Sequence, residues 1–132
     1  MKKTTLLNSQ LSAVIAKMGH TDSIAVGDCG LPIRGSAERV DLALKKGVPD
    51  FITTLETVLS ELCVERAVIA SETKSVSPEM YNNIMAVLGD QIEVEFVEHE
   101  TFKKMTESCA AIVRTGECTP YSNIILYSGV TF

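Results

Sequence analysis

Apolar residues along the chain alternate between a helical spacing and a strand spacing from one end to the other. A first helix is predicted from about Asn8 to Met18, because five apolar residues fall on one helical face: Leu7, Leu11, Val14, Ile15 and Met18. Asn8 is a favourable N-cap residue, and Gly19 is expected to end the helix in a left-handed conformation. The chain therefore opens with an amphipathic helix.

Three more helices are predicted from the same spacing. The second begins at Pro49 and Asp50 and buries Phe51, Leu55, Val58, Leu59 and Leu62. The third begins at Ser77-Pro78-Glu79, ends at Gly89, and has an inner face made of Tyr81, Ile84, Met85 and Leu88. The fourth runs from about His99 to Cys109 and buries Phe102 and Met105.

Short apolar or alternating segments between these helices predict strands. They lie at residues 23–27, 40–44, 66–70, 92–96, 110–114 and 123–127. Strands that alternate with helices in this way indicate an α/β fold with a central, mostly parallel sheet flanked by helices. Since there is no linker, repeat or low-complexity segment, we expect one domain over residues 1–132.

Composition narrows the possible partners. The net charge of −5 and the scattered basic residues argue against nucleic acid, which is bound by clustered Lys and Arg. No apolar run is long enough for a membrane helix. The polar residues Asn8-Ser9-Gln10 interrupt the apolar start too early for a signal peptide, so we expect a cytoplasmic protein.

Four cysteines occur, at positions 29, 63, 109 and 118, without the paired spacing of a zinc site. In a cytoplasmic chain we expect them to be reduced thiols that pack as small apolar residues. Neither a metal nor another cofactor is predicted.

Candidate chemistry lies at the junctions between elements. His20 follows the first helix, whose carbonyl end favours a protonated imidazole together with nearby Asp22, so His20 is a candidate acid near neutral pH. Asp28 follows a strand, where α/β sheets collect their ligands, and it is only eight positions from His20, so the two can converge on one pocket. The alternatives are a solvated junction histidine and an Asx-turn.

Two further segments are weaker candidates. His99 and Lys103 are one turn apart on the fourth helix, where they either hold a polar ligand or form a solvated edge. Residues 115–123 form a loop with hydroxyl and amide groups, including Tyr121 and Asn123, that suits a sugar but also a long hairpin loop. Phosphate-binding, dinucleotide and zinc-protease motifs are missing. The residues by themselves indicate an α/β domain that binds a small polar molecule.

Several short phrases, in order along the whole chain, resemble the D-ribose pyranase and fucose mutarotase family. They are Leu7-Asn8-Ser9, Gly19-His20-Thr21-Asp22, Asp28-Cys29-Gly30-Leu31-Pro32-Ile33, Thr115-Gly116-Glu117, Pro120-Tyr121-Ser122-Asn123 and Gly129-Val130-Thr131-Phe132. Each phrase is weak alone, but the ordered set is specific.

The resemblance implies a D-ribose pyranase-like fold and an enzyme that interconverts the pyranose and furanose forms of free D-ribose without metal or cofactor. It implies His20 as the proton donor. It implies Asp28, His99, Tyr121 and Asn123 as residues that bind the sugar, with Lys103 as a further contact. It also implies a ring-shaped homo-oligomer, commonly a decamer of two pentameric rings, with sites near subunit contacts.

Alternatives to ribose remain at this stage. Fucose mutarotases share several phrases, but they usually have an aromatic residue in place of Leu31 and lack a histidine at the position of His99. A non-catalytic sugar-binding protein and an aldose–ketose isomerase are the other possibilities. Cys118, inside the predicted binding loop, is expected to be a spacer.

Overall fold

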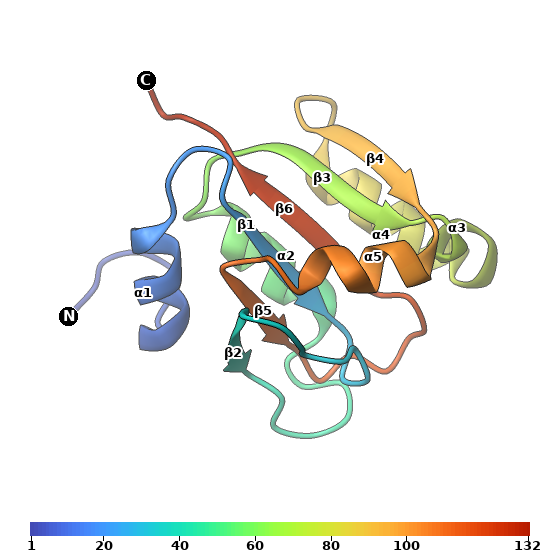
Figure 1. Cartoon of the computed structure of the whole chain (residues 1–132). Coiled ribbons are helices and arrows are strands. Elements are labelled where there is room, and N and C mark those ends of the chain that lie inside the picture. Colours follow the sequence, from blue (N-terminus) through green and yellow to red (C-terminus); the bar gives the residue numbers. More distant parts are fainter.

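The computed structural model describes residues 1–132 and contains one six-stranded sheet. The strands lie in the order β2-β5-β1-β6-β3-β4 (Figure 1). Their bounds are β1 Ser23–Gly27, β2 Glu38–Asp41, β3 Val64–Ala70, β4 Glu93–Val97, β5 Ala111–Arg114 and β6 Ile124–Ser128.

Five of the strands run in the same direction, and β6 alone is reversed. β1 pairs in parallel with β5, β5 with β2, and β3 with β4, whereas β6 is antiparallel to both of its neighbours, β1 and β3. The prediction of a mostly parallel sheet is confirmed. Because β1 lies between β5 and β6, the loop at residues 115–123 crosses the end of β1, and the hairpin alternative is wrong.

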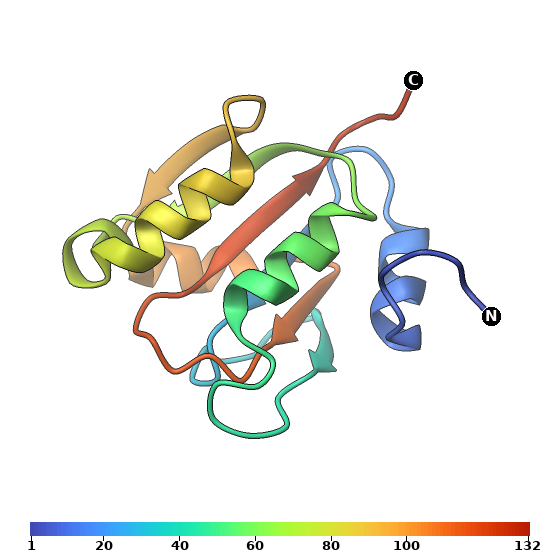
Figure 2. The same ribbon diagram turned by 180° about the vertical axis from the view of Figure 1, so that it is seen from behind.

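Helices cover both faces of the sheet. Their bounds are α1 Ser9–Lys17, α2 Phe51–Leu59, α3 Glu72–Val76, α4 Pro78–Leu88 and α5 His99–Thr106. α2 and α4 lie on one face and α5 lies on the other (Figures 1 and 2). No helix is both long and apolar enough to cross a membrane.

Alternation along the strands builds two separate apolar cores. In β1, Ile24 and Val26 belong to the larger core with α1, α2 and α4, whereas Ala25 belongs to the smaller core around Phe102 of α5. The central strands are thus buried on both faces, as expected for parallel strands under two helical layers.

Several predicted details are wrong for identifiable reasons. Gly19 does not adopt a positive φ, since the chain leaves α1 through the extended residue Met18. Leu7 precedes the helix and is exposed. β2 ends at Asp41, so Leu44 lies in an exposed turn. The short helix α3 was missed because five residues are too few to show helical periodicity.

The carboxyl ends of the five parallel strands form one edge of the sheet, and their amino ends form the opposite edge. Different candidate site residues lie at these two edges. Asp28 follows the end of β1, His99 follows the end of β4, and Asn123 precedes the reversed strand β6, so all three lie at the carboxyl edge. His20 precedes β1 and therefore lies beyond the opposite edge.

Candidate functional site

Asp28 and Asn123 form a two-way clamp at the carboxyl edge of the sheet. The side-chain amide of Asn123 donates to Asp28 Oδ2 at 3.0 Å, and its Oδ1 accepts from the Asp28 backbone N–H at 3.0 Å. Asn123 is 1% exposed, and both the nitrogen and the oxygen of its side-chain amide are hydrogen-bonded to Asp28. Asn123 therefore fixes the direction in which the Asp28 carboxylate points.

The backbone around Gly27 makes room for this clamp. A Cβ atom at Gly27 would lie 2.8 Å from Asn123 Oδ1 and 2.5 Å from Leu31 Cδ2, closer than real contacts allow. Thr115 adds a hydrogen bond from its hydroxyl to the Gly27 carbonyl at 2.8 Å. The small residue is required by the close approach of three segments.

Burial perturbs the carboxyl group of Asp28. Loss of water around the side chain raises its pKa above the ordinary aspartate value, and this exceeds the opposing effect of hydrogen bonds from Gly30 and Asn123 and of the nearby His99. The Gly30 N–H donates to the second oxygen, Oδ1, at 2.9 Å. This oriented and half-buried carboxyl is suited to holding hydroxyl groups of a ligand.

His99 lies near Asp28, and Tyr121 contacts His99. Their rings meet edge to face with centroids 4.9 Å apart, and Tyr121 has a positive φ of 60° that side chains rarely adopt. The Nδ1 atom of His99 is buried and has no hydrogen-bond partner in the chain. A buried polar atom without a partner is costly, so this nitrogen is a natural contact for a ligand. We call Asp28, His99, Tyr121 and Asn123 the Asp28 cluster.

Glu72 of α3 places His99. Its two carboxylate oxygens accept from the His99 backbone N–H at 3.1 and 3.0 Å, at the first turn of α5. This bond is the main reason that the pKa of Glu72 is lowered. Thr73, the next residue, donates its hydroxyl to the Tyr121 carbonyl at 2.9 Å. The short helix thus holds both aromatic members of the cluster.

Glu117 holds the loop that carries Tyr121. Its carboxylate accepts from the backbone of Cys118, from the backbone and hydroxyl of Thr119, and from the backbone of Phe51 at the start of α2. Burial acts to raise the pKa of Glu117, but these hydrogen bonds outweigh it and the pKa is lowered. The Thr-Gly-Glu phrase is therefore a loop anchor.

Lys103 lies one turn after His99 on α5. Its ammonium pairs with Glu100 Oε1 at 2.6 Å, and it lines a separate polar hollow with Pro32 and Arg34. A role for Lys103 in holding a ligand stays a prediction.

His20 sits in a turn beyond the other edge of the sheet. The Asp22 carboxylate accepts from the Gly19 backbone N–H at 2.8 Å, and Thr21 has a positive φ of 71°. Thr21 and Tyr121 are the two non-glycine residues with a positive φ. Both adjoin or belong to the predicted site, where such strain is commonly found.

Glu65, rather than Asp22, is the carboxylate that contacts His20. Glu65 Oε2 lies 3.2 Å from His20 Nε2, and the two side chains are 48% and 51% exposed. The register between β3 and β6 shifts between Val64 and Arg66, so Glu65 sits at an irregularity of the strand pairing. Such bulges redirect a side chain, here towards the histidine.

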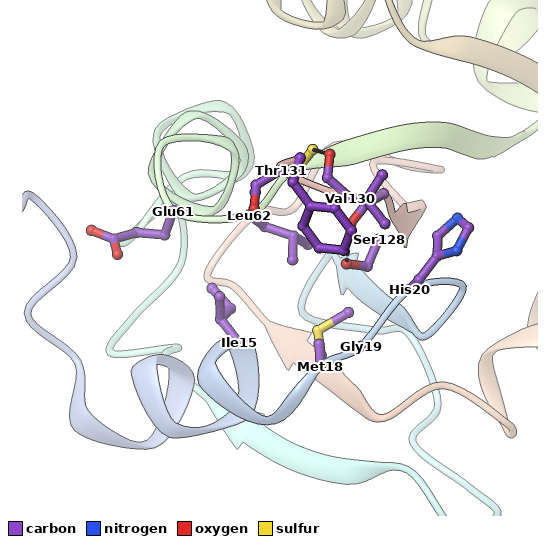
Figure 3. Close-up of a pocket in the computed structure, with 12 residues that line it drawn as sticks. Ile15, Met18, Gly19, His20, Glu61, Leu62, Ser128, Val130 and Thr131 are labelled. Atoms are coloured by element: carbon purple, nitrogen blue, oxygen red, sulfur yellow. Dashed lines mark hydrogen bonds between the residues drawn. The ribbon is translucent and has the colours of Figure 1, made fainter.

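A hollow of about 340 Å³ adjoins His20 (Figure 3). It lies between the end of α1, the segment after α2 and the C-terminal tail. Val130 and Phe132 of the tail line it and are themselves largely exposed. Apolar residues of α1 and of the tail line the hollow together with the His20 side chain.

One chain does not bring His20 and the Asp28 cluster together. The whole of β1 separates His20 from Asp28, and five extended residues span roughly 16 Å. Both ends are held by backbone hydrogen bonds, from Thr21 to Ser128 and from Thr115 to Gly27. The expectation that the two residues share a pocket of the same chain is therefore wrong. No three His, Cys, Asp or Glu side chains are grouped in a way that could hold a metal ion.

Sequence reasoning missed Glu65 and Glu72. Neither has a local signal, because Glu65 meets His20 across 45 positions and Glu72 belongs to the helix that was not predicted. The phrase Gly129-Val130 gave an indirect hint: a Cβ at Gly129 would lie 3.3 Å from the Cβ of Glu65, so the glycine permits this packing.

Comparisons with known proteins agree on one family. The sequence profile of the RbsD / FucU transport protein family matches residues 1–131. D-ribose pyranase of Clostridium botulinum is 58% identical over 132 residues, which is all of both chains. D-ribose pyranase of Haemophilus influenzae is 57% identical over an alignment of 139 residues, again covering both chains fully.

Solved structures show the same fold. RbsD of Bacillus subtilis, complexed with D-ribose, matches with a TM-score of 0.96 and 40% identity over all of both chains. The fucose mutarotase of Streptococcus pneumoniae, in complex with L-fucose, matches with a TM-score of 0.79 and 21% identity over 95% of this chain and 94% of the other. At that identity the second match shows the fold alone.

Proposed function

We infer the function of this chain from the fact that it belongs to the RbsD / FucU transport protein family. Within that family it is a D-ribose pyranase, an isomerase that interconverts the pyranose and furanose forms of free D-ribose. The observation that carries this assignment is the full-length match, at 40% identity, to a chain solved with D-ribose.

The reaction requires only proton transfers to and from oxygen atoms of the sugar. The ring of a hemiacetal opens when a proton reaches the ring oxygen while another leaves the anomeric hydroxyl. The open chain then closes again through a different hydroxyl. One imidazole that gains and loses protons near neutral pH can serve both transfers, and such catalysis contributes about 10²- to 10⁴-fold.

The Asp28 cluster is the proposed sugar-binding part of the site. Asp28 is oriented by Asn123 and accepts hydrogen bonds from sugar hydroxyls. The buried Nδ1 of His99 is placed to bind a further hydroxyl, and the Tyr121 ring packs against the sugar. In this account Asn123 acts mainly through Asp28, since both ends of its amide are already used.

His20 is the proposed proton donor, and Glu65 is its positioning residue. A carboxylate at Nε2 favours the proton on that nitrogen, so Nδ1 is left to exchange protons with the sugar. When the imidazole becomes protonated, Glu65 also stabilises its positive charge.

The complete site requires two copies of the chain. Because His20 and Asp28 lie at opposite edges of the sheet, a sugar held by the cluster of one copy receives its proton from His20 of a neighbour. Both edges expose apolar side chains that a contact between two copies can bury. These are Val130 and Phe132 beside His20, and Val76 of α3, the helix that holds His99 and Tyr121.

This arrangement favours a ring. Contact between two different surfaces of the same chain is heterologous, and heterologous contacts close into rings when the rotation permits. The resemblance to the family implies the number of chains in the oligomer, which is ten, arranged as two pentameric rings. It also implies a cytoplasmic enzyme that takes free D-ribose and supplies its furanose form to a kinase.

Saturation-transfer NMR on D-ribose tests the function. The intact protein, in buffer with a chelator, should accelerate pyranose–furanose exchange, and His20→Ala should abolish the acceleration while the protein stays folded. Acceleration of L-fucose anomer exchange without any effect on ribose would contradict the assignment in favour of a fucose mutarotase. Ribose binding without exchange would indicate a binding protein.

A further inference from the structure

Cys29 and Cys118 form a pair of neighbouring thiols at the carboxyl edge of the sheet. Their sulfur atoms are 3.6 Å apart although 89 positions separate them in sequence. Cys29 is half-buried and Cys118 is exposed, so the pair is open to solvent from the side of Cys118. The expectation that these thiols merely pack as apolar residues does not account for this contact.

The backbone on both sides keeps the two thiols in register. The Cys29 N–H donates to the Glu117 carbonyl at 2.8 Å, directly beside Cys118. The Arg114 side chain donates to the Cys29 carbonyl at 3.1 Å. The Cys118 N–H is bound by the Glu117 carboxylate at 3.0 Å. Neither cysteine can therefore drift away without breaking these bonds.

The other two cysteines lack such a partner. Cys109 is buried, and burial is the main cause that raises the pKa of its thiol. Cys63 is exposed, but its thiol donates to the Val130 carbonyl at 3.2 Å. The pairing is thus particular to Cys29 and Cys118 and gives the chain a matched control at Cys63.

We propose that Cys29 and Cys118 are a redox modification site, which closes to an intramolecular disulfide by exchange with a low-molecular-weight disulfide such as oxidised glutathione. The sulfurs must approach by about 1.6 Å to reach bonding distance, a shift that side-chain rotation can supply. Closure covalently joins the segment after β1, which carries Asp28, to the loop that carries Tyr121.

The exchange balances in two steps. The exposed Cys118 thiolate attacks one sulfur of the small disulfide, whose S–S bond breaks and releases one small thiol. Cys29 then gives up its proton and attacks Cys118 in the mixed disulfide, which releases the second small thiol. The two protein thiols are oxidised by two electrons, and the small disulfide is reduced to two thiols.

The experiment treats the full chain with oxidised glutathione, counts free thiols and maps crosslinked peptides by mass spectrometry. We expect the count to fall from four to about two, with a Cys29–Cys118 crosslink that dithiothreitol reverses. Cys63→Ser should retain the crosslink. Cys29→Ser and Cys118→Ser should lose it, and Cys29→Ser should keep a glutathione adduct on Cys118.

Two results would overturn the proposal. One is glutathione adducts on the intact chain with no Cys29–Cys118 crosslink. The other is a crosslink between chains through Cys63 in place of the internal one. Neither result bears on ribose exchange, so the proposal fails or stands independently of the proposed function.

Discussion

Asn123 and Asp28 exchange two hydrogen bonds, one in each direction, across 95 positions of the sequence. The pair joins the start of β6 to the end of β1, two strands that are neighbours in the sheet. It holds a half-buried carboxylate that lies near His99, whose ring in turn contacts Tyr121. The contact fixes the Asp28 side chain, and its hydrogen bond opposes the rise that burial causes in the pKa of Asp28.

Asn123→Asp should destabilise the protein, because the donor to Asp28 is replaced by a second carboxylate. We expect the free energy of unfolding to fall by about 3 kcal/mol at pH 7. One carboxyl of the close pair has a raised pKa and gains a proton as the pH falls, so the loss should shrink towards pH 5. Urea unfolding midpoints at a fixed protein concentration measure both effects.

The control for this substitution is Asn8→Asp. Asn8 Oδ1 caps α1 by accepting from Leu11, and an aspartate accepts equally well. Equal losses in the two variants would show that the Asn123 clamp contributes nothing particular.

Ribose affinity should depend on the charge of Asp28. Because the pKa of Asp28 is raised by burial, protonation begins at a higher pH than for an ordinary aspartate. The ionised form is the better acceptor, so affinity should be complete above this pKa. Below it, affinity should fall by about tenfold per pH unit.

Calorimetric titration of D-ribose from pH 7 down to pH 4 measures this dependence. A His20→Ala background keeps ring exchange out of the measurement, and His99 and Cys29 are the titratable side chains near Asp28. Asp28→Asn in the same background should bind more weakly at pH 7 and lose the acid dependence. An unchanged acid dependence in Asp28→Asn would contradict the assignment of the dependence to Asp28.

Glu65→Gln should slow ring exchange without weakening ribose binding. The amide no longer stabilises a protonated His20, and because a half-exposed ion pair contributes at most about 1 kcal/mol, we expect the rate to fall by up to about fivefold. NMR exchange rates and the Kd for ribose separate the two effects. Glu61→Gln is the matched control, since Glu61 lines the same hollow without contacting His20. A loss of rate that is equal in both variants would refute the positioning role.

The sequence predicted the layers of the fold well because burial imposes a period. Residues Ile24 and Val26 alternate with Ala25 between two cores, and Phe102 anchors the helix over the smaller one. β2 and α3 were harder, since their positions depend on contacts with β5 and Tyr121.

Part of the candidate site could likewise be predicted from the sequence, and part could not. Asp28 was predicted because ligands collect at the ends of strands, and His20 because only two histidines occur in this chain. The position of His20 relative to Asp28 could not be predicted from their closeness in sequence, because an extended strand carries neighbours apart. The contact of Glu65 with His20 could not be predicted, because it depends on the pairing of β3 with β6. The register of that pairing shifts next to Glu65, where Val64 pairs with Ser128.

Complementation between two inactive variants tests most directly whether His20 acts on a sugar held by the neighbouring chain. His20→Ala and Asp28→Ala, each carrying a different affinity tag, are produced together, and mixed oligomers are purified through both tags. Random assembly in equal amounts leaves about one quarter of the shared sites with both native residues. We therefore expect each variant alone to be inactive in D-ribose exchange and the mixed oligomer to recover about a quarter of the native rate. A mixed oligomer as inactive as its parents would contradict the shared site, and full activity of His20→Ala alone would contradict His20 as the proton donor.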